Sequence, residues 1–418
     1  MTPPADARSQ LEFLVRNASE VIPREELLAK LERSLQEGRP LRVKLGLDPT
    51  AAEVTLGWAV VLRKLREFQD MGHTAVLIVG DFTARVGDPS GKSETRPRLD
   101  KEAVRAYADR VLGQFRKILG PKPLEIRHNS EWLETMSMED LLGLTSRYTV
   151  ARMLERDDFA TRFREQRPIS VMEFLYPLLQ AKDSVAVRAD VELGGTDQKF
   201  NLLVGREIQR DYGLEPQVVF TMPLLVGLDG ERAMGQSLGN YVGISEPPEE
   251  MFGKLMRVPD HLIVMYLRLC TNLPPEQIDA IDRGLADGSR HPNQEKRLMA
   301  REVVCIYHGE SSAEQAEARF DTVHREREIP EDVPEVVLPP DLLGQEKVWL
   351  PRVMSALGMA SSNAEARRLI QQGGVRIGGE RVADPEVEIA VVDLLGRVIQ
   401  VGRRKFARVV APTGGSGL

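Results

Sequence analysis

Hydrophobic and polar positions along residues 42–81 predict a strand, a helix and a second strand. The first apolar-rich run, 42–47, stops at the turn signal Asp-Pro-Thr of residues 48–50, since proline fixes φ and aspartate can bond its own backbone. Between residues 56 and 71, apolar side chains recur every three or four positions, which is typical of an amphipathic helix. Residues 74–81 are continuously apolar, as in a strand covered on both faces.

A strand, a helix and a strand in succession predict a right-handed βαβ unit and a doubly wound parallel sheet. Ligands of such sheets bind beyond the carboxyl ends of the strands, where Asp48 and Asp81 fall. The helix that opens at Leu56-Gly57 directs its N-terminus into the same crevice. Its free N–H groups and its dipole make that position suitable for phosphate.

Residues 174–183 carry polar groups on one face of a predicted helix. Tyr176, Gln180 and Asp183 stand at i, i+4 and i+7 among large apolar neighbours. Such a stripe is either a solvated face or a buried polar cluster, and both interpretations stay open. Shortly afterwards, residues 191–198 bring Gly194-Gly195 and Asp197-Gln198 to a strand-to-helix turn, where a ligand can approach the backbone closely.

Residues 87–96 form a Gly/Ser-rich loop with two cations, Lys92 and Arg96. Taken alone, this loop is more simply explained as a solvated turn than as a phosphate-binding loop.

The C-terminal part of the chain has a different pattern. Prolines mark residues 330–346 as a stiff linker. Beyond it, a capping box at 362–365 predicts a short helix through Arg367 and Arg368, and residues 375–379 predict a hairpin. The stretch 401–409 then sets four cations around one phenylalanine; they include Arg403, Arg404 and Lys405.

Composition narrows the classes of protein. The 418 residues exceed a single ordinary core, and 42% hydrophobic with 28% charged residues is typical of a globular chain. The net charge is −7, yet residues 347–418 hold eleven Lys/Arg against six Asp/Glu, which gives +5 there and −12 elsewhere. RNA is therefore expected to bind the basic C-terminal part.

Several classes of site and location are not expected. The cysteines lack metal-site or disulfide spacing, and no histidines form a ligand pair, so we expect no metal site and no Ser-His-Asp hydrolase. No apolar run is long enough to span a membrane, and the polar start lacks a signal-peptide core. A cytoplasmic location is expected.

Two motifs carry a resemblance to a known family. Residues 47–58 end in Thr55-Leu56-Gly57-Trp58 and resemble the nucleotide-binding signature of class I aminoacyl-tRNA synthetases, which normally has histidines at the first and last of these positions. Residues 233–237, Ala-Met-Gly-Gln-Ser, resemble the second signature, Lys-Met-Ser-Lys-Ser. Together with the strings around 176–183 and 191–198, they make nearly the whole chain similar to bacterial tyrosyl-tRNA synthetases with an S4-type C-terminal domain.

The resemblance implies an architecture: a Rossmann-type catalytic domain (1–244), a helical domain (245–329), the linker (330–346) and a small α+β S4 RNA-binding domain (347–418). It also implies a homodimer, with tyrosine and tRNA as partners, ATP with Mg as substrate if the protein is active, and no tightly bound cofactor.

The resemblance further implies roles for single residues. Tyr176, Gln180 and Asp88 would hold the α-amino group of tyrosine, Asp183 its phenolic hydroxyl and Gln198 its carboxylate region. The nucleotide side would consist of Gly46, Asp48, Gly57, Gly195 and Asp197, with Thr50, Lys92 and Arg96 attending the phosphates. Lys182 stands where the family usually has an aromatic residue. It would either compete for Asp183 or, as we favour, extend outward.

Both signatures have lost their charged side chains, at Thr55, Trp58, Ala233 and Gln236. Activation of an amino acid by ATP depends on placement and charge stabilisation, and one lost donor typically costs about 3 kcal/mol. Trp58 would occlude the nucleotide or stack on adenine; we favour occlusion. Three hypotheses follow: an activation-impaired relative that keeps tyrosine and tRNA binding, a fully active ligase with variant signatures, and a relative repurposed for specialised metabolism.

Overall fold

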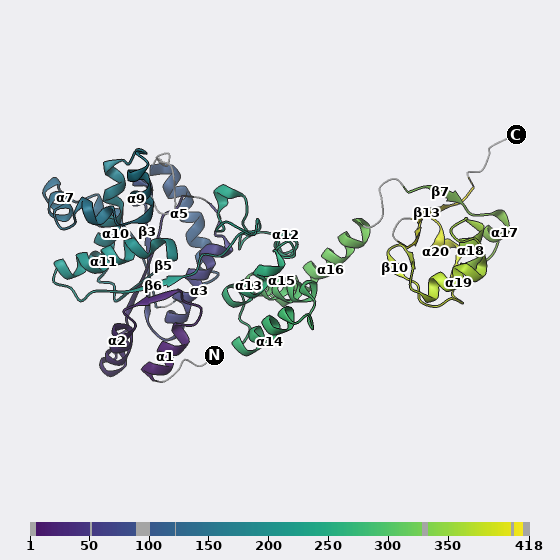
Figure 1. The fold of residues 1–418 in the computed structure, drawn as a ribbon, viewed down its shortest axis with the longest axis horizontal. Helices are drawn as coiled ribbons and strands as arrows, with labels where there is room; N and C mark the ends of the chain where they lie inside the picture. The colour runs from purple at the N-terminus through teal and green to yellow at the C-terminus, as the bar shows by residue number, and fades with distance from the viewer. Residues whose placement is uncertain are drawn as a thin grey trace. The chain divides into compact units, whose positions relative to one another are not determined.

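The structure, a computed structural model, describes residues 6–50, 52–88, 101–121, 123–327, 333–402 and 405–412. The chain forms two compact units, Met1–Ala316 and Glu317–Leu418 (Figure 1). Lys92, Arg96, Arg403 and Arg404 lie outside the described residues.

A six-stranded sheet forms the centre of the first unit, in the order β1-β6-β5-β2-β3-β4. Its strands are β1 (Glu20–Ile22), β2 (Arg42–Leu47), β3 (Thr74–Val79), β4 (Leu124–His128), β5 (Val191–Gly195) and β6 (Val218–Met222). Strand β1 is antiparallel to β6, and all other pairs are parallel. The direction of winding reverses between β2 and β5, so the crevice where ligands bind is expected at their carboxyl ends.

Helices surround this sheet (Figure 1). They are α1 (Ala7–Leu14), α2 (Arg24–Glu37), α3 (Leu56–Asp70), α4 (Thr83–Val86), α5 (Lys101–Phe115), α6 (Ser130–Leu133), α7 (Met138–Thr145), α8 (Val150–Met153), α9 (Asp157–Arg164), α10 (Val171–Val187) and α11 (Lys199–Asp211), with the 3-10 turn η1 (Thr196–Gln198). The predicted β2-α3-β3 unit is confirmed. The apolar stripe of α3 (Val60, Leu62, Leu65 and Phe68) is buried, as its period requires.

The end of β3 is fixed by Gly80. A Cβ at this position would lie 2.0 Å from Oδ1 of Asp48 and 2.5 Å from Oγ1 of Thr83. Only glycine therefore lets β3 and α4 approach the end of β2 this closely.

A second set of helices follows: α12 (Pro248–Leu255), α13 (Ile263–Cys270), α14 (Pro275–Ala286), α15 (Pro292–His308) and α16 (Glu310–Arg327), with the 3-10 turns η2 (Gln236–Leu238) and η3 (Asp260–Leu262). The boundary between the two units falls within α16. Helices α12 and α13 pack on α15, and α13 also packs on α3. The helical character expected here is present, while the division at 245 and 329 stays a prediction.

The second unit contains a five-stranded sheet, β10-β9-β12-β13-β7, and the pair β11-β8. Its elements are β7 (Glu335–Val337), α17 (Pro340–Leu343), β8 (Lys347–Trp349), α18 (Leu350–Ala356), α19 (Asn363–Gln371), β9 (Val375–Ile377), β10 (Glu380–Arg381), β11 (Glu388–Ala390), α20 (Val391–Leu394), β12 (Val398–Val401) and β13 (Lys405–Val410). The predicted hairpin is confirmed as β9 and β10, which pair antiparallel.

The described residues of the expected linker, 333–346, are folded instead. Strand β7 pairs with β13, while Leu338 and Leu342 are fully buried in the core of the second unit. Prolines indicate a linker because they cannot continue a strand or a helix. Pro340, however, begins α17, where a missing backbone N–H removes no hydrogen bond from the helix.

Only one of the two hydrogen bonds of the predicted capping box at α19 is present. Oγ of Ser362 accepts from the backbone N–H of Glu365 at 3.2 Å, as predicted. The carboxylate of Glu365, however, accepts from the backbone N–H of Ser361 at 2.6 Å rather than from that of Ser362.

Candidate functional site

The carboxyl end of β2 brings three elements together at Asp48. Oγ1 of Thr83, from α4, donates to Oδ1 of Asp48 at 2.7 Å, and the hydroxyl of Tyr176, from α10, donates to Oδ2 at 2.8 Å. Part of the Asp48 side chain still reaches the crevice, yet the surrounding protein desolvates its carboxyl group. That desolvation, with Asp88 and Asp183 nearby, raises the pKa of Asp48 to about 7 despite the two hydrogen bonds.

Asp183 lies on the same face of α10 and is 3% exposed. Nε1 of Trp132 donates to its Oδ1 at 2.8 Å, and Nδ2 of Asn129 donates to its Oδ2 at 3.3 Å. Burial raises the pKa of Asp183 to about 7, against the opposing influence of Lys44 and these two donors. The stripe on α10 is therefore a buried polar cluster and not a solvated face.

A charged layer lies beneath this cluster. Nζ of Lys44 bonds the backbone oxygen of Gln180 at 3.0 Å, Oγ of Ser184 at 2.8 Å and Oε1 of Glu192 at 2.8 Å. Lys44 and Glu192 face each other across the β2–β5 pair and are fully buried. Sequence reasoning missed both, although a lysine between Val43 and Leu45 in a central strand is a signal that could have found it.

Gln180 takes part in this layer through its side chain. Its Nε2 donates to Oε1 of Glu192 at 3.1 Å, which fixes the orientation of the amide. The amide oxygen is thereby the atom left to accept a hydrogen bond from an ammonium group.

Lys182 extends away from Asp183, as we favoured. Its Nζ lies 4.5 Å from the centre of the Tyr212 ring, on α11's C-terminal side.

The turn after β5 places Gln198 and Asp197 beside Asp88. Nε2 of Gln198 donates to Asp88 at 2.9 Å and to Asp197 at 3.1 Å, while its Oε1 accepts from Nδ2 of Asn201 at 3.1 Å. A Cβ at Gly195 would lie 2.5 Å from Oδ1 of Asp197, so the close turn requires glycine. A Cβ at Gly46, in contrast, would meet open space within 4 Å.

The two signature segments meet at the start of α3. A Cβ at Gly57 would lie 3.4 Å from Cβ of Met234, and Thr55 pairs with Gly243 in an antiparallel bridge. Nε2 of Gln236 donates to the backbone oxygen of Glu53, which directly joins one segment to the other. Motifs about 180 residues apart in sequence therefore form one surface.

None of the substituted side chains brings a charge to this surface. Thr55 is buried and caps α3, its Oγ1 accepting from the backbone N–H of Trp58 at 3.4 Å. Trp58 and Gln236 are half-buried, and Ala233 is exposed. Thr50 lies at the end of the turn after β2, with its N–H bonded to the backbone oxygen of Asp48 at 2.8 Å.

Asn240 holds the second segment in shape. Its Oδ1 accepts from the backbone N–H of Gly235 at 2.9 Å, and its Nδ2 donates to Asp229 at 2.9 Å. Although burial opposes it, hydrogen bonds from the backbone of Glu231 and Arg232 and from Asn240 lower the pKa of Asp229 to about 2. The loop is thus internally bonded where the family signature would present lysines.

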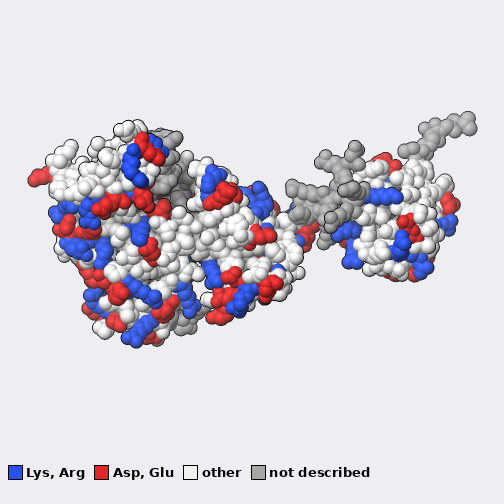
Figure 2. Space-filling model, viewed as in Figure 1, with Lys and Arg blue, Asp and Glu red and all other residues white. Residues whose placement is uncertain are grey.

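Two of the described candidate cations of the second unit already have partners within that unit. Arg367 forms an ion pair with Glu386, and Nζ of Lys405 donates to the backbone oxygens of Gly358 and Met359 at 2.9 and 3.2 Å. Arg368 is exposed. Over the face of the molecule in Figure 2, basic and acidic side chains are otherwise interspersed.

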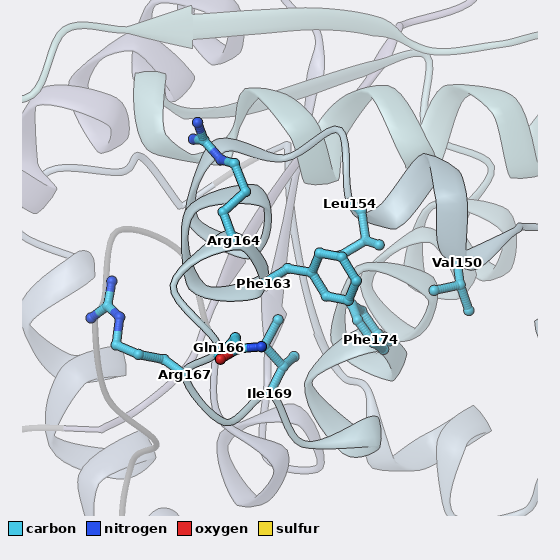
Figure 3. A pocket seen from close by; sticks show the side chains of 8 residues that line it. All are labelled: Val150, Leu154, Phe163, Arg164, Gln166, Arg167, Ile169 and Phe174. Atoms are coloured by element: carbon cyan, nitrogen blue, oxygen red, sulfur yellow. The ribbon is translucent and has the colours of Figure 1, made fainter.

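A separate hollow of about 640 Å³ lies away from the strand ends, at α8, α9 and the start of α10. Its lining is Val150, Leu154, Phe163, Arg164, Gln166, Arg167, Ile169 and Phe174 (Figure 3). It is largely apolar and lacks the converging carboxyl groups of the crevice, so we do not assign it to the candidate site.

Within the part of the chain that the structure describes, no cluster of three or more histidine, cysteine, aspartate or glutamate residues could hold a metal ion. Cys270 is buried, as expected, while Cys305 is half-buried. No helix among these residues combines the length and apolar character needed to cross a membrane.

Comparisons with known proteins agree with this geometry. Residues 36–325 match the family described as tRNA synthetases class I (W and Y), and residues 348–393 match the S4 domain. The chain is 53% identical to the tyrosine–tRNA ligase of Moorella thermoacetica, over 96% of this chain and 95% of that one. It is 51% identical to that of Thermotoga maritima, over 98% of each.

A solved structure shares the fold. The crystal structure of tyrosyl-tRNA synthetase complexed with L-tyrosine from Archaeoglobus fulgidus aligns with a TM-score of 0.61, over 74% of this chain and 99% of that one, at 23% identity. The chain therefore belongs to the tyrosyl-tRNA synthetase family of class I tRNA synthetases, with an S4 domain in its C-terminal unit.

Proposed function

We propose that this protein binds tyrosine and tRNA but activates tyrosine with ATP weakly or not at all. The observation that supports this most directly is the contact between Gln236 and the backbone of Glu53. It joins the two segments that serve triphosphate in the family, and it does so with an uncharged amide where a lysine is expected. The site has a tyrosine half, around Tyr176 and Asp183, and a triphosphate half, around Thr55 and Gln236.

The tyrosine half of the site holds several carboxyl groups, and hydrogen bonds fix its side chains. Asp88, Tyr176 and Gln180 would surround the ammonium group of tyrosine, with the hydroxyl of Tyr176 held by Asp48 and the amide of Gln180 held by Glu192. Asp183 would accept the phenolic hydroxyl. A buried carboxylate selects for a hydroxyl because a ligand without one leaves it unpaired, and tyrosyl-tRNA synthetases are themselves the standard example of such selectivity.

The triphosphate half lacks the groups that stabilise developing negative charge. Activation proceeds by in-line attack of the tyrosine carboxylate on the α-phosphorus of ATP, with pyrophosphate leaving, and the protein contributes placement and charge. Four donors are replaced at Thr55, Trp58, Ala233 and Gln236. With about 3 kcal/mol per donor and half of the sum lost to non-additivity, the deficit is about 6 kcal/mol, on the order of ten-thousandfold in rate.

The acidic neighbours make this deficit worse. Asp48, Asp88 and Asp197 lie at the crevice, and like charge repels a triphosphate that has lost the four signature donors. If activation persists, ATP would enter with Mg as a substrate, attended by Thr50, Lys92 and Arg96, near Gly46, Gly57 and Gly195. We favour occlusion of the nucleotide position by Trp58.

The S4 domain would hold tRNA. Arg368 is exposed, and Arg367, Arg403, Arg404 and Lys405 belong to the same basic part of the sequence. Lysine and arginine that track phosphates give an affinity that falls steeply with salt. The proposed contact is therefore tested by tRNA binding at about 50 and about 200 mM salt, where the affinity should fall.

We also propose a cytoplasmic homodimer. Helices α7 to α10 expose five large apolar side chains: Met138, Leu142, Val150, Phe163 and Val171. The same surface on a second copy would cover them in a twofold pair. Light scattering tests this: the wild type should be a dimer and the Phe163→Asp variant a monomer. A monomeric wild type would contradict the proposal.

The central test measures two properties of the wild-type protein side by side. Calorimetry should show tyrosine binding in the absence of ATP. Tyrosine-dependent ATP–pyrophosphate exchange should be at background. Exchange at the pace of a housekeeping synthetase would overturn the proposal and favour the fully active ligase.

The third hypothesis, a relative repurposed for specialised metabolism, shares the tyrosine site and so predicts the same binding. It differs by predicting biosynthetic genes beside this one and an intact synthetase elsewhere in the genome. Nothing among the described residues favours it over simple impairment.

A further inference from the structure

We infer that Lys44 is a specificity-determining residue: its buried ammonium favours the carboxylate form of Asp183, the form that accepts a phenolic hydroxyl. The inference rests on the proposed tyrosine binding at this site. It concerns a residue that lies behind the pocket and acts through another side chain.

The position of Lys44 carries the argument. Its Nζ lies against the turn of α10 that bears Asp183, because it bonds both the backbone oxygen of Gln180, three residues before, and Oγ of Ser184, one residue after. A positive charge held on this turn favours an ionised Asp183.

A contribution to folding stability does not explain why Lys44 forms a buried ion pair with Glu192. Both side chains are fully buried, and taking two charges out of water costs several kcal/mol per ion before their attraction offsets it. An apolar pair of similar volume would pack at the same place without that cost. A role in the electrostatics of the pocket does explain a buried cation here.

Charged and titratable groups face Asp183 from several elements. Lys44 on β2 favours its ionised form, and Glu192 on β5 disfavours it. Asp48 and Tyr176 are electrostatically coupled to it from the crevice side. Burial raises the pKa of Asp183 to about 7, and Lys44 is the largest influence in the opposite direction, ahead of the donors Trp132 and Asn129. Without Lys44, a larger fraction of Asp183 would be protonated at neutral pH.

The first experiment needs no ligand. Because Nε1 of Trp132 donates to Asp183, its indole N–H resonance in ¹⁵N-labelled protein should titrate with that carboxyl group; a Trp132→Phe spectrum assigns it. In the double variant Lys44→Met/Glu192→Gln, which leaves no lone buried charge, we expect the midpoint to move up, because the influence of Lys44 on Asp183 is larger than the opposing influence of Glu192.

A matched control is present in the chain. Lys64, also buried, forms an ion pair with Glu67 on α3. The variant Lys64→Met/Glu67→Gln should leave the Trp132 midpoint unchanged. An unchanged midpoint in the Lys44 variant as well would overturn the inference, whether or not tyrosine binds.

The second experiment measures specificity by calorimetry with tyrosine and phenylalanine. Between about pH 6 and 7, the ratio of the two affinities should fall about five- to tenfold in the Lys44 variant, and it should recover near pH 9, where Asp183 is ionised again. A purely structural role would lower both affinities equally and leave the ratio unchanged, which overturns the inference.

The two proposals fail in different ways. Wild-type protein that shows no tyrosine binding contradicts the proposed function, and the specificity role falls with it. Tyrosine binding with an unaltered ratio contradicts only the role of Lys44.

Discussion

The two halves of the crevice were assembled by the same fold but hold opposite chemistry. Around Asp183 and Asp48, ionisable groups are buried with partners that fix their geometry. Around Thr55 and Gln236, neutral groups bond backbone atoms of the protein itself. The difference teaches that the tyrosine half can stay intact while the triphosphate half loses its charges. The reason is that the halves depend on different elements. The tyrosine half depends on α10 and β5, and the triphosphate half on the start of α3 and residues 225–243.

Restoring the charges would break this contrast most strongly. In the variant Thr55→His/Trp58→His/Ala233→Lys/Gln236→Lys, we expect tyrosine-dependent ATP–pyrophosphate exchange to rise by on the order of ten-thousandfold, because four donors again face the developing charge. The measurement is radiolabelled exchange at saturating ATP. Equal exchange in wild type and variant would show that the neutral half was never impaired.

Removing the carboxylate of the other half should weaken its binding of tyrosine. For Asp183→Asn we expect tyrosine affinity to fall about a hundredfold, since a hydrogen bond to a charged group is worth about 1.5–3 kcal/mol. Calorimetry without ATP measures it. Asp70→Asn, which alters an exposed carboxylate of α3, is the control and should bind as wild type does. Undiminished binding by Asp183→Asn would place tyrosine elsewhere.

Changing the pH should sharpen the contrast without a mutation. The pKa of Asp183 is raised to about 7, so tyrosine affinity should fall about tenfold per unit as the pH drops below 7, while phenylalanine affinity stays nearly level. Calorimetry with each amino acid across this pH range measures both slopes, and parallel slopes would rule out Asp183 as the group that titrates.

The stability of the free protein should change in the opposite direction. Asp48 and Asp183 both have a folded pKa near 7, above their unfolded value, so their contribution is present at low pH and is lost as the pH rises toward 7. Urea unfolding with and without Asp48→Asn measures this. If the substitution left the difference in stability between about pH 5 and 8 as it was, Asp48 would not be the group responsible.

The smallest expected effect concerns the contact that joins the two signature segments. Gln236→Ala removes one hydrogen bond, worth about 1 kcal/mol, and should speed amide hydrogen exchange in residues 233–243 about fivefold. Gln315→Ala, on the exposed face of α16, is the matched control. Unchanged exchange at 233–243 would mean that Asn240 alone holds this loop.

Periodicity and resemblance predicted much of the fold and half of the site. The helix at 56–70 and the strand at 74–79 follow from local pattern, because each buries one stripe or both faces. The linker prediction failed at Leu338 and Leu342, since proline content reports where regular structure is interrupted and not whether the chain is buried. Lys44 was missed because nothing local says that a charged side chain in a strand will find Glu192 on its neighbour.

By itself the sequence determined the family, the β2-α3-β3 unit and which signature charges are lost, because these depend on residue types and short-range spacing. Only the tertiary structure decided that Trp132 and Asn129 converge on Asp183, that Lys44 lies behind it, and that Gln236 bridges to Glu53. The reason is physical: a parallel sheet brings together the carboxyl ends of strands far apart in the chain, and the fields and hydrogen bonds that set the chemistry act across space rather than along the sequence.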